Sequence, residues 1–222
     1  MAETQEVQAI QNVVEKIENF IEDNKQAVAI GGGVLVVIVL AFLFVWLKWL
    51  PERNLKAARE MYMAEMAFQK DSFNLALNGN GVNKGLLEIQ SKYSFTKAAN
   101  LSNYYIGLCY LNTNKFEDAI KYLDKYSTSD PILGAVKLSA IGDAYSELNK
   151  VDDATKYYEK AAEFSDNSQF TPFYILKLGA YFESQKKFKE AVEKYKEVKT
   201  KYPSSEEARQ ADANIARATA QM

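Results

Sequence analysis

The chain has 222 residues, a formal net charge of −2, one cysteine and no histidine. The lack of histidine excludes Ser-His-Asp and Cys-His nucleophile systems and the HExxH type of zinc site, and a single cysteine excludes an intrachain disulfide. Because there is also no phosphate-binding glycine loop and no strongly basic balance, we expect neither an enzyme nor a nucleic-acid-binding protein, and we predict no catalytic residue, cofactor or metal ligand.

Residues 1–26 predict an acidic amphipathic helix, because they hold six acids and two lysines around a stripe of apolar residues. The stripe advances in alternating three- and four-residue steps, which places it on one face of a helix. The predicted seam consists of Val7, Ile10, Val14, Ile17 and Ile21. The acids disfavour an anionic lipid surface. The seam is therefore either a docking or self-association surface, or one face of a short helix that packs on nothing in particular.

Residues 27–50 predict a transmembrane helix. The first 21 of them carry no charge, and at about 1.5 Å per residue this run spans roughly 32 Å, the thickness of a bilayer core. A cleaved signal peptide would have a shorter apolar run, a basic start and small residues at its exit, and a buried core helix would show polar residues over six turns. Trp46, Lys48 and Trp49 are typical of a membrane interface. The run therefore predicts an uncleaved anchor surrounded by lipid.

The charges beside this anchor bear on its orientation. Within about 20 residues of the run, the amino side holds two lysines and the carboxyl side holds four basic residues. They are Lys16 and Lys25 before it, and Lys48, Arg53, Lys56 and Arg59 after it. Taken alone, the positive-inside rule places the carboxyl side in the cytoplasm.

Residues 51–99 predict a degenerate helix pair. Ala64 and Ala76 lie twelve residues apart, a step that recurs further along the chain. The second helix is then interrupted by "NGNGVNKG" at 78–85, whose glycines and asparagines predict a loop. The role of this loop is left open by the sequence.

Residues 100–203 repeat themselves. Gly107, Gly142 and Gly179 are 35 and 37 residues apart, and an alanine follows each of them twelve residues later. Each unit has an apolar residue before the glycine, an aromatic residue three positions after it, and then a polar turn. A period of this length predicts stacked helix pairs in which the small residues lie where the two helices touch. The predicted fold class is therefore an all-α solenoid of three repeats that follows a single amino-terminal transmembrane helix.

Residues 204–222 predict a C-terminal capping helix. Ser204 and Glu207 have the spacing of a capping box, and small apolar residues follow them at helical steps. Further back, Cys109 lies two residues after a repeat glycine, a crowded position. We therefore predict that Cys109 is a small buried side chain and not a reactive thiol.

The repeating units resemble the tetratricopeptide repeat. Each unit shows Leu/Ile-Gly, then Tyr or Phe, then an apolar residue and Ala at the start of the second helix, and two units close with Asp130-Pro131 or Tyr202-Pro203. Repeats of this family bind partners along the concave face of their first helices, so the resemblance implies a partner-binding groove. The implied groove residues are Met61, Glu65, Phe68, Leu101, Tyr104, Leu108, Val136, Ser139, Asp143, Phe173 and Leu176. The alternative for each of them is ordinary core between repeats.

The layout of the whole chain is similar to that of the YfgM-like family of bacterial ancillary translocon subunits. The similarity lies in the acidic start, the stretch "FIEDNKQAVAIGGGVLVVIVL", and repeats that contain "TPFYILKLG" and "KYPSSEEA". This resemblance implies a non-catalytic accessory subunit of the Sec translocon in the bacterial inner membrane, with a cytoplasmic amino terminus and a periplasmic repeat domain. The implied partners are a SecYEG-type channel, a PpiD-like chaperone and emerging client polypeptides.

Two other functions fit the same sequence. A membrane-tethered scaffold for another envelope assembly or secretion machine would have the same architecture. A cytoplasm-facing regulatory adaptor would agree with the charges that flank the anchor, which oppose the topology of the YfgM-like family.

Overall fold

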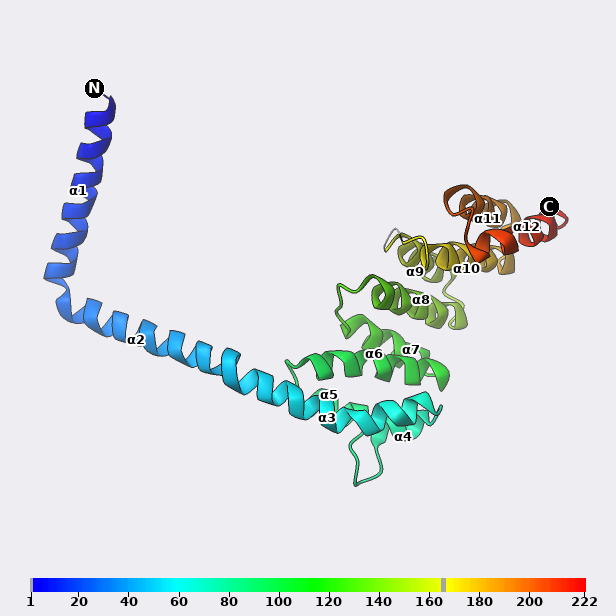
Figure 1. Ribbon diagram of the computed structural model, residues 1–222, viewed down its shortest axis with the longest axis horizontal. Coiled ribbons are helices and arrows are strands. Elements are labelled where there is room, and N and C mark those ends of the chain that lie inside the picture. Colours follow the sequence, from blue (N-terminus) through cyan, green and yellow to red (C-terminus); the bar gives the residue numbers. More distant parts are fainter. Residues whose placement is uncertain (1, 165–166) are drawn as a thin grey trace. The chain divides into compact units, whose positions relative to one another are not determined.

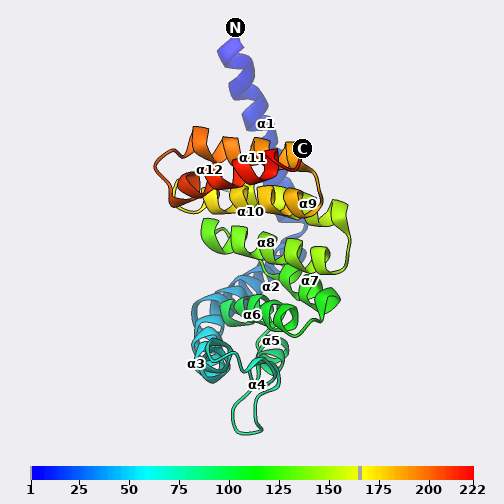
Figure 2. The ribbon, with the colours of Figure 1, turned by 90° about the vertical axis from the view of Figure 1, so that its right-hand side faces the viewer.

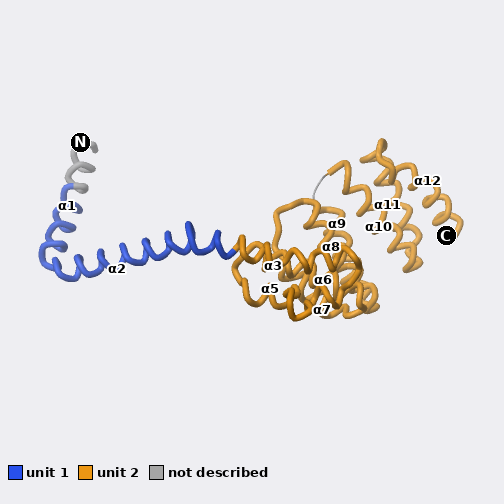
Figure 3. The backbone as a smooth tube through the Cα atoms, turned by 60° about the horizontal axis from the view of Figure 1, so that its bottom comes forward, with its two compact units in different colours: residues 1–53 blue, residues 54–222 orange. Residues whose placement is uncertain are grey.

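The computed structural model describes residues 2–164 and 167–222, and the side chains among them from residue 11 onward. Two compact units are distinguished, Met1–Arg53 and Asn54–Met222 (Figure 3). The predicted fold class is confirmed: the described residues form helices and turns without a strand, and the second unit is a solenoid of helix pairs (Figure 1).

The first unit is built from two long helices and a short π-helix. They are α1 (Ala2–Asp23), α2 (Lys25–Phe44) and the π-helix η1 (Val45–Trp49). Asn24 separates α1 from α2, and its amide Nδ2 donates to the carbonyl oxygen of Phe20 at 3.0 Å. The side chains of Val14, Ile17 and Ile21 are exposed within this unit, whereas those of Val7 and Ile10 lie outside the described residues.

Helical structure continues from α2 through η1 into α3 (Leu50–Gln69) without a loop. Within the described part of the chain, this continuous helix is the one that is long and apolar enough to cross a membrane. Trp46 and Trp49 are exposed, and the Arg53 guanidinium lies 4.9 Å from the centre of the Trp49 ring. The wide turn of η1 has a local cause. Pro51 lacks an N–H group and its ring crowds the carbonyl four residues earlier, which falls inside η1.

The second unit consists of successive helices, which are joined by turns and, at 79–85, by a loop. After α3 they are α4 (Phe73–Asn78), α5 (Leu86–Lys92), α6 (Lys97–Asn112), α7 (Phe116–Lys125), α8 (Pro131–Glu147), α9 (Val151–Glu163), α10 (Thr171–Ser184), α11 (Phe188–Lys201) and α12 (Glu206–Thr219). Within this unit α6, α8 and α10 are the first helices of three pairs, and they follow one another as layers in Figure 2. The carboxyl-terminal α12 packs on α10 and α11.

The same turn ends the first helix of every pair. Asp71, Asn114, Asn149 and Lys186 adopt positive φ angles of 55° to 59° after α3, α6, α8 and α10. Asn and Asp tolerate this left-handed conformation better than most residues, whereas a lysine accepts it at some cost. The turn after α3 therefore has the same left-handed backbone conformation as the turns within the later pairs.

Apolar and small side chains fill the space between the helices. Ile106, Leu123, Ile141, Leu178 and Tyr195 are fully buried or nearly so. Full burial of one such side chain stabilises a protein by about 1.5 to 3 kcal/mol. Cys109 is also fully buried, and burial raises the pKa of its thiol to about 12, so the prediction that it is not a reactive thiolate agrees with its surroundings.

The carboxyl-terminal helix begins one residue later than predicted. The cap is Ser205, whose Oγ accepts a hydrogen bond from the Ala208 N–H at 3.0 Å, and Ser204 does not cap α12. The predicted capping box with Glu207 is therefore wrong. The backbone of Ser205 is extended, with ψ of 158°, which turns its hydroxyl toward the first helical turn.

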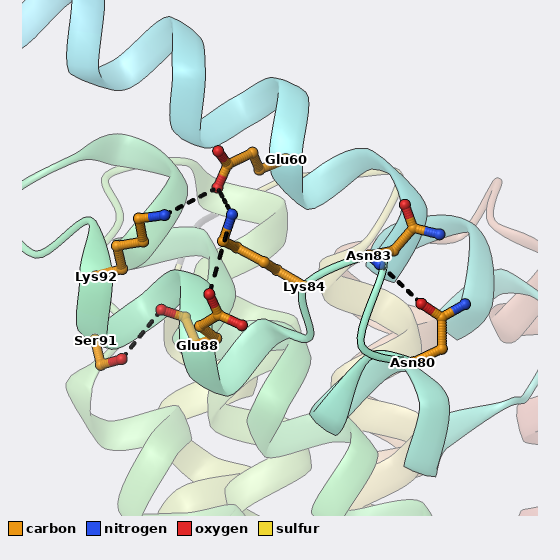
Figure 4. A network of polar contacts seen from close by, with 7 residues as sticks. All are labelled: Glu60, Asn80, Asn83, Lys84, Glu88, Ser91 and Lys92. Carbon is orange, nitrogen blue, oxygen red and sulfur yellow. Dashed lines mark hydrogen bonds and ion pairs between the residues drawn. The ribbon is translucent and has the colours of Figure 1, made fainter.

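Ionic contacts hold the loop at 79–85 against α3 (Figure 4). Lys84 Nζ lies 2.8 Å from a carboxylate oxygen of Glu60, and Lys92 Nζ approaches the same oxygen at 4.0 Å. Within the loop, Asn80 Oδ1 accepts hydrogen bonds from the N–H groups of Val82 and Asn83. The inserted loop is thus tied to the helix pair that it interrupts.

Candidate functional site

The candidate site lies on the first helices of the pairs, on a different side from the repeat glycines. The glycine side of each first helix is covered by the second helix of the same pair. A Cβ atom on Gly142 would lie 2.8 Å from Cδ1 of Tyr158, and one on Gly179 would lie 2.6 Å from Cε1 of Tyr195. These distances are shorter than van der Waals contact, so glycine is what lets each second helix pack so closely.

The predicted groove residues lie on α3, α6, α8 and α10, and we call this set the first-helix face. In α6, α8 and α10 they occupy positions six and three residues before the repeat glycine and one residue after it. In α3, Ala64 takes the place of the glycine, Met61 and Glu65 keep this register, and Phe68 lies four residues after Ala64. The members are Met61, Glu65, Phe68, Leu101, Tyr104, Leu108, Val136, Ser139, Asp143, Phe173 and Leu176.

The first-helix face is partly open to solvent. Phe173 is 50% exposed. The half-buried members are Glu65, Phe68, Leu101, Leu108, Val136, Asp143 and Leu176. Met61, Tyr104 and Ser139 are buried. These three side chains lie in the interior, beneath the exposed members of the face. Met61 Sδ, for example, accepts a hydrogen bond from Ser102 Oγ at 3.2 Å.

Aromatic rings connect α3 to α6 along this face. The ring centroids of Phe68 and Tyr105 are 5.0 Å apart, and those of Tyr104 and Tyr105 are 5.4 Å apart, both edge to face. Such pairs contribute about 0.5 to 1.5 kcal/mol beyond the burial of their area. Burial raises the pKa of Tyr104 to about 12, so this phenol stays protonated and uncharged near neutral pH.

A lysine that the sequence did not predict as a groove residue connects α10 to α8 on this face. Lys177 Nζ lies 2.7 Å from Asp143 Oδ1 and donates a hydrogen bond to Ser139 Oγ at 2.8 Å. The Tyr158 hydroxyl also donates to Asp143 Oδ1, at 2.6 Å. The Asp143 carboxylate is therefore fully engaged within the protein. The sequence feature that could have identified it is a lysine two residues before Gly179, because the other repeats have Tyr105 and Ala140 at this position.

Glu65 has different surroundings. Among the described residues no hydrogen bond or ion pair reaches its half-buried carboxylate, and burial raises the pKa of this group. Tyr105 lies close enough that its own pKa is raised first by burial and then by the charge of Glu65. The face therefore holds one neutralised acid, Asp143, and one acid that lacks a cation.

A second polar cluster fastens α12 to the last repeat. Arg217 Nε and one of its terminal nitrogens donate to the two oxygens of Glu183, at 2.7 and 2.9 Å, and the Tyr195 hydroxyl donates to Glu183 at 2.8 Å. The Arg217 hydrogen bonds are the largest influence on Glu183, and together with that of Tyr195 they hold the pKa of its carboxyl below the usual value despite burial. Sequence reasoning missed this cluster because its members are 34 residues apart.

A hollow of about 560 Å³ between α9, α10 and α11 shares no residue with the first-helix face. Its charged lining consists of Glu159, Glu163, Glu197, Lys194 and Lys201. Glu197 already forms ion pairs with both lysines, at 3.0 and 2.7 Å. This mixed lining indicates no particular class of ligand.

Comparison with known proteins identifies the repeats. Residues 102–131, 138–168 and 174–205 match models of the tetratricopeptide repeat. No curated protein sequence matches the chain.

Two solved structures have a similar fold. The MamA protein is 18% identical with a TM-score of 0.55, and the match covers 74% of this chain and 81% of that one. A protein from Podosopora anserina, described as a kinesin light chain with nearly identical TPR-like repeats, is 13% identical with a TM-score of 0.57, over 75% and 86% of the two chains. At these identities the likeness concerns the fold alone. The chain therefore contains three tetratricopeptide repeats and an apolar helix near its amino terminus.

Proposed function

We propose that this protein is a membrane-anchored, non-catalytic scaffold that binds polypeptide partners along the first-helix face. The observation that carries the proposal is the row of apolar side chains on adjacent first helices that stay partly open to solvent. The row contains Leu101, Leu108, Val136, Phe173 and Leu176. Tetratricopeptide repeats are typically scaffolds for protein–protein interaction, and partly exposed apolar side chains in a row suit a partner's apolar segment.

A finer function follows from the resemblance of the whole chain to the YfgM-like family. In this proposal the apolar helix anchors the protein in the bacterial inner membrane, and the repeats lie in the periplasm. The first-helix face then receives chains that emerge from a SecYEG-type channel, or it binds a PpiD-like chaperone. The acidic amino-terminal helix, with exposed Val14, Ile17 and Ile21, offers a second contact for a partner.

A cytoplasm-facing adaptor is the second candidate function. Lys48, Arg53, Lys56 and Arg59 follow the apolar helix closely, and basic residues favour the cytoplasmic side of a membrane. The scaffold function of the first-helix face is the same in both candidates, so orientation of the chain in the membrane separates them.

Photocrosslinking in native membranes tests the proposed function. A photoreactive amino acid replaces Leu108 or Phe173 on the first-helix face, and Glu190, exposed on the second helix α11, serves as the matched control. We expect polypeptide adducts from the two face positions and few from position 190. Equal amounts of adduct from all three positions would show that the first-helix face is not the binding surface.

Mass spectrometry of the adducts then tests the finer function. A channel subunit or a periplasmic chaperone in the adducts of positions 108 and 173 is the expected result. Adducts that contain only other proteins would contradict the translocon role and leave the scaffold function standing.

A further inference from the structure

Successive first helices meet through a recurring pair of positions. The residue that follows the small residue of one first helix lies beside the residue two positions before the glycine of the next. Between α8 and α10 this pair is Asp143 and Lys177, with Nζ and Oδ1 2.7 Å apart. Between α3 and α6 it is Glu65 and Tyr105, which interact electrostatically. Between α6 and α8 it is apolar, because Leu108 packs in the cluster that contains Ala140.

The three junctions differ in how their charges are balanced. Asp143 has its cation within the protein, and the Leu108 junction has no charge to balance. At the Glu65 junction the acid is present and the cation is not, because a tyrosine stands where α10 has Lys177. A half-buried carboxylate without a cation is costly to keep ionised, and an amine or guanidinium placed beside it would remove much of that cost.

The side chains around Glu65 also suit a long basic residue. Tyr105 interacts with Glu65, and the Phe68 ring, three residues after Glu65 on α3, packs edge to face with Tyr105 at a centroid distance of 5.0 Å. Aromatic surface accommodates the aliphatic stem of lysine or arginine, and a ring face attracts the cationic end. The protein already contains this arrangement at its other acidic junction, where Lys177 Nζ lies 5.3 Å from the centre of the Tyr158 ring while it pairs with Asp143.

We propose that Glu65 is the specificity-determining residue of the first-helix face and binds a lysine or arginine side chain of the bound polypeptide. The partner is then an apolar segment that carries a basic residue, and this residue supplies to the α3–α6 junction the cation that Lys177 supplies to the α8–α10 junction. The inference rests on the proposed function, because it requires a polypeptide on the first-helix face.

A peptide library tests the proposal on the full chain reconstituted in lipid nanodiscs. The probe is a pool of 12-residue peptides with apolar residues at most positions and a lysine, arginine, glutamine or glutamate fixed at each position in turn. We expect peptides with a basic residue to bind about tenfold more tightly than their glutamine twins, which corresponds to about 1.4 kcal/mol for a charge-assisted hydrogen bond. The variant Glu65→Gln should bind both twins equally.

Two further variants make the test specific. Glu159→Gln removes an exposed carboxylate of α9 that lies outside the first-helix face, and it should keep the preference for basic peptides. Tyr105→Lys should remove the preference, because it places an amine beside Glu65 within the protein. Thermal unfolding of each variant shows whether it is folded.

The outcomes separate the inference from the proposed function. If the wild type binds peptides without preferring basic residues, or if Glu65→Gln keeps the preference, Glu65 is not the specificity residue and the scaffold function stands. If no peptide binds, or if Leu108→Asp leaves binding unchanged, the first-helix face is not the binding surface and both proposals are wrong.

Discussion

At the scale of single residues, the repeat glycines set how closely the helices of a pair approach. Gly179 illustrates the constraint, because the Tyr195 ring beside it is fully buried and its hydroxyl is fastened to Glu183 at 2.8 Å. The ring therefore has little freedom to move away from an added methyl group. The same reasoning applies to Gly142, whose neighbour Tyr158 is fastened to Asp143.

We expect Gly179→Ala to destabilise the protein. Alanine gains about 1 kcal/mol of helix propensity over glycine, but an overpacked core typically loses about 1 to 3 kcal/mol. A new Cβ 2.6 Å from Tyr195 Cε1 should make the second effect the larger, with a net loss of about 1 kcal/mol. The midpoint of urea unfolding of the full chain in mild detergent measures this change.

The neighbouring residue gives the matched control. Ala180 is exposed on the same helix, so Ala180→Gly reports helix propensity without any change in packing. Its loss of about 1 kcal/mol calibrates the gain expected from the reverse exchange at position 179. A Gly179→Ala variant as stable as the wild type would show that the close approach does not require glycine.

At the scale of elements, the stability of α12 on the last repeat depends on pH through Glu183. Its folded pKa is depressed, so the group contributes stability that is fully present above its unfolded pKa of about 4.3 and is lost as the pH falls through the lower folded pKa. We expect Glu183→Gln to lower the free energy of unfolding at neutral pH by about 1 to 2 kcal/mol. A hydrogen bond to a charged group contributes about 1.5 to 3 kcal/mol, and solvent screening reduces this value because the Arg217 side chain is more than half exposed.

Unfolding at several pH values checks this sign. The difference between wild type and Glu183→Gln should be largest near neutral pH and should shrink as the pH is lowered through the folded pKa of Glu183, because the wild type then loses the charge that the variant never had. A difference that stays constant with pH would show that packing, and not the charge of Glu183, accounts for the loss.

The elements also show how far the sequence alone leads. The glycine-to-alanine step and the polar turns predicted the helix pairs, because both features recur at a fixed distance within one pair. The same register selected eight residues that are exposed or half-buried, together with Met61, Tyr104 and Ser139, which are buried. The pairings between different repeats could not be predicted in this way, since Lys177 meets Asp143, and Arg217 meets Glu183, only after the helices are stacked. The choice between Ser204 and Ser205 as helix cap depended on one ψ angle that the sequence does not specify.

At the scale of the whole molecule, two features bear on the topology: the charges beside the apolar helix and the length of the unit that follows it. Four basic residues follow the apolar run closely and favour the cytoplasm for that side. The positive-inside rule applies to loops of up to about 60 residues, and longer domains cross the membrane largely regardless of charge. The unit from Asn54 to Met222 is far longer than such a loop. The charges therefore do not exclude the periplasmic repeat domain of the proposed function.

Protease digestion of intact spheroplasts decides between the two orientations. If the repeats are periplasmic, as we propose, added protease should degrade the unit from Asn54 to Met222 while a cytoplasmic marker protein stays intact. A triple variant with glutamine in place of Arg53, Lys56 and Arg59 should be digested at least as completely, because it loses the residues that favour the cytoplasm. Protection of the repeats in intact spheroplasts, followed by digestion after lysis, would contradict the translocon role and favour the cytoplasm-facing adaptor. The scaffold function would then apply to cytoplasmic partners.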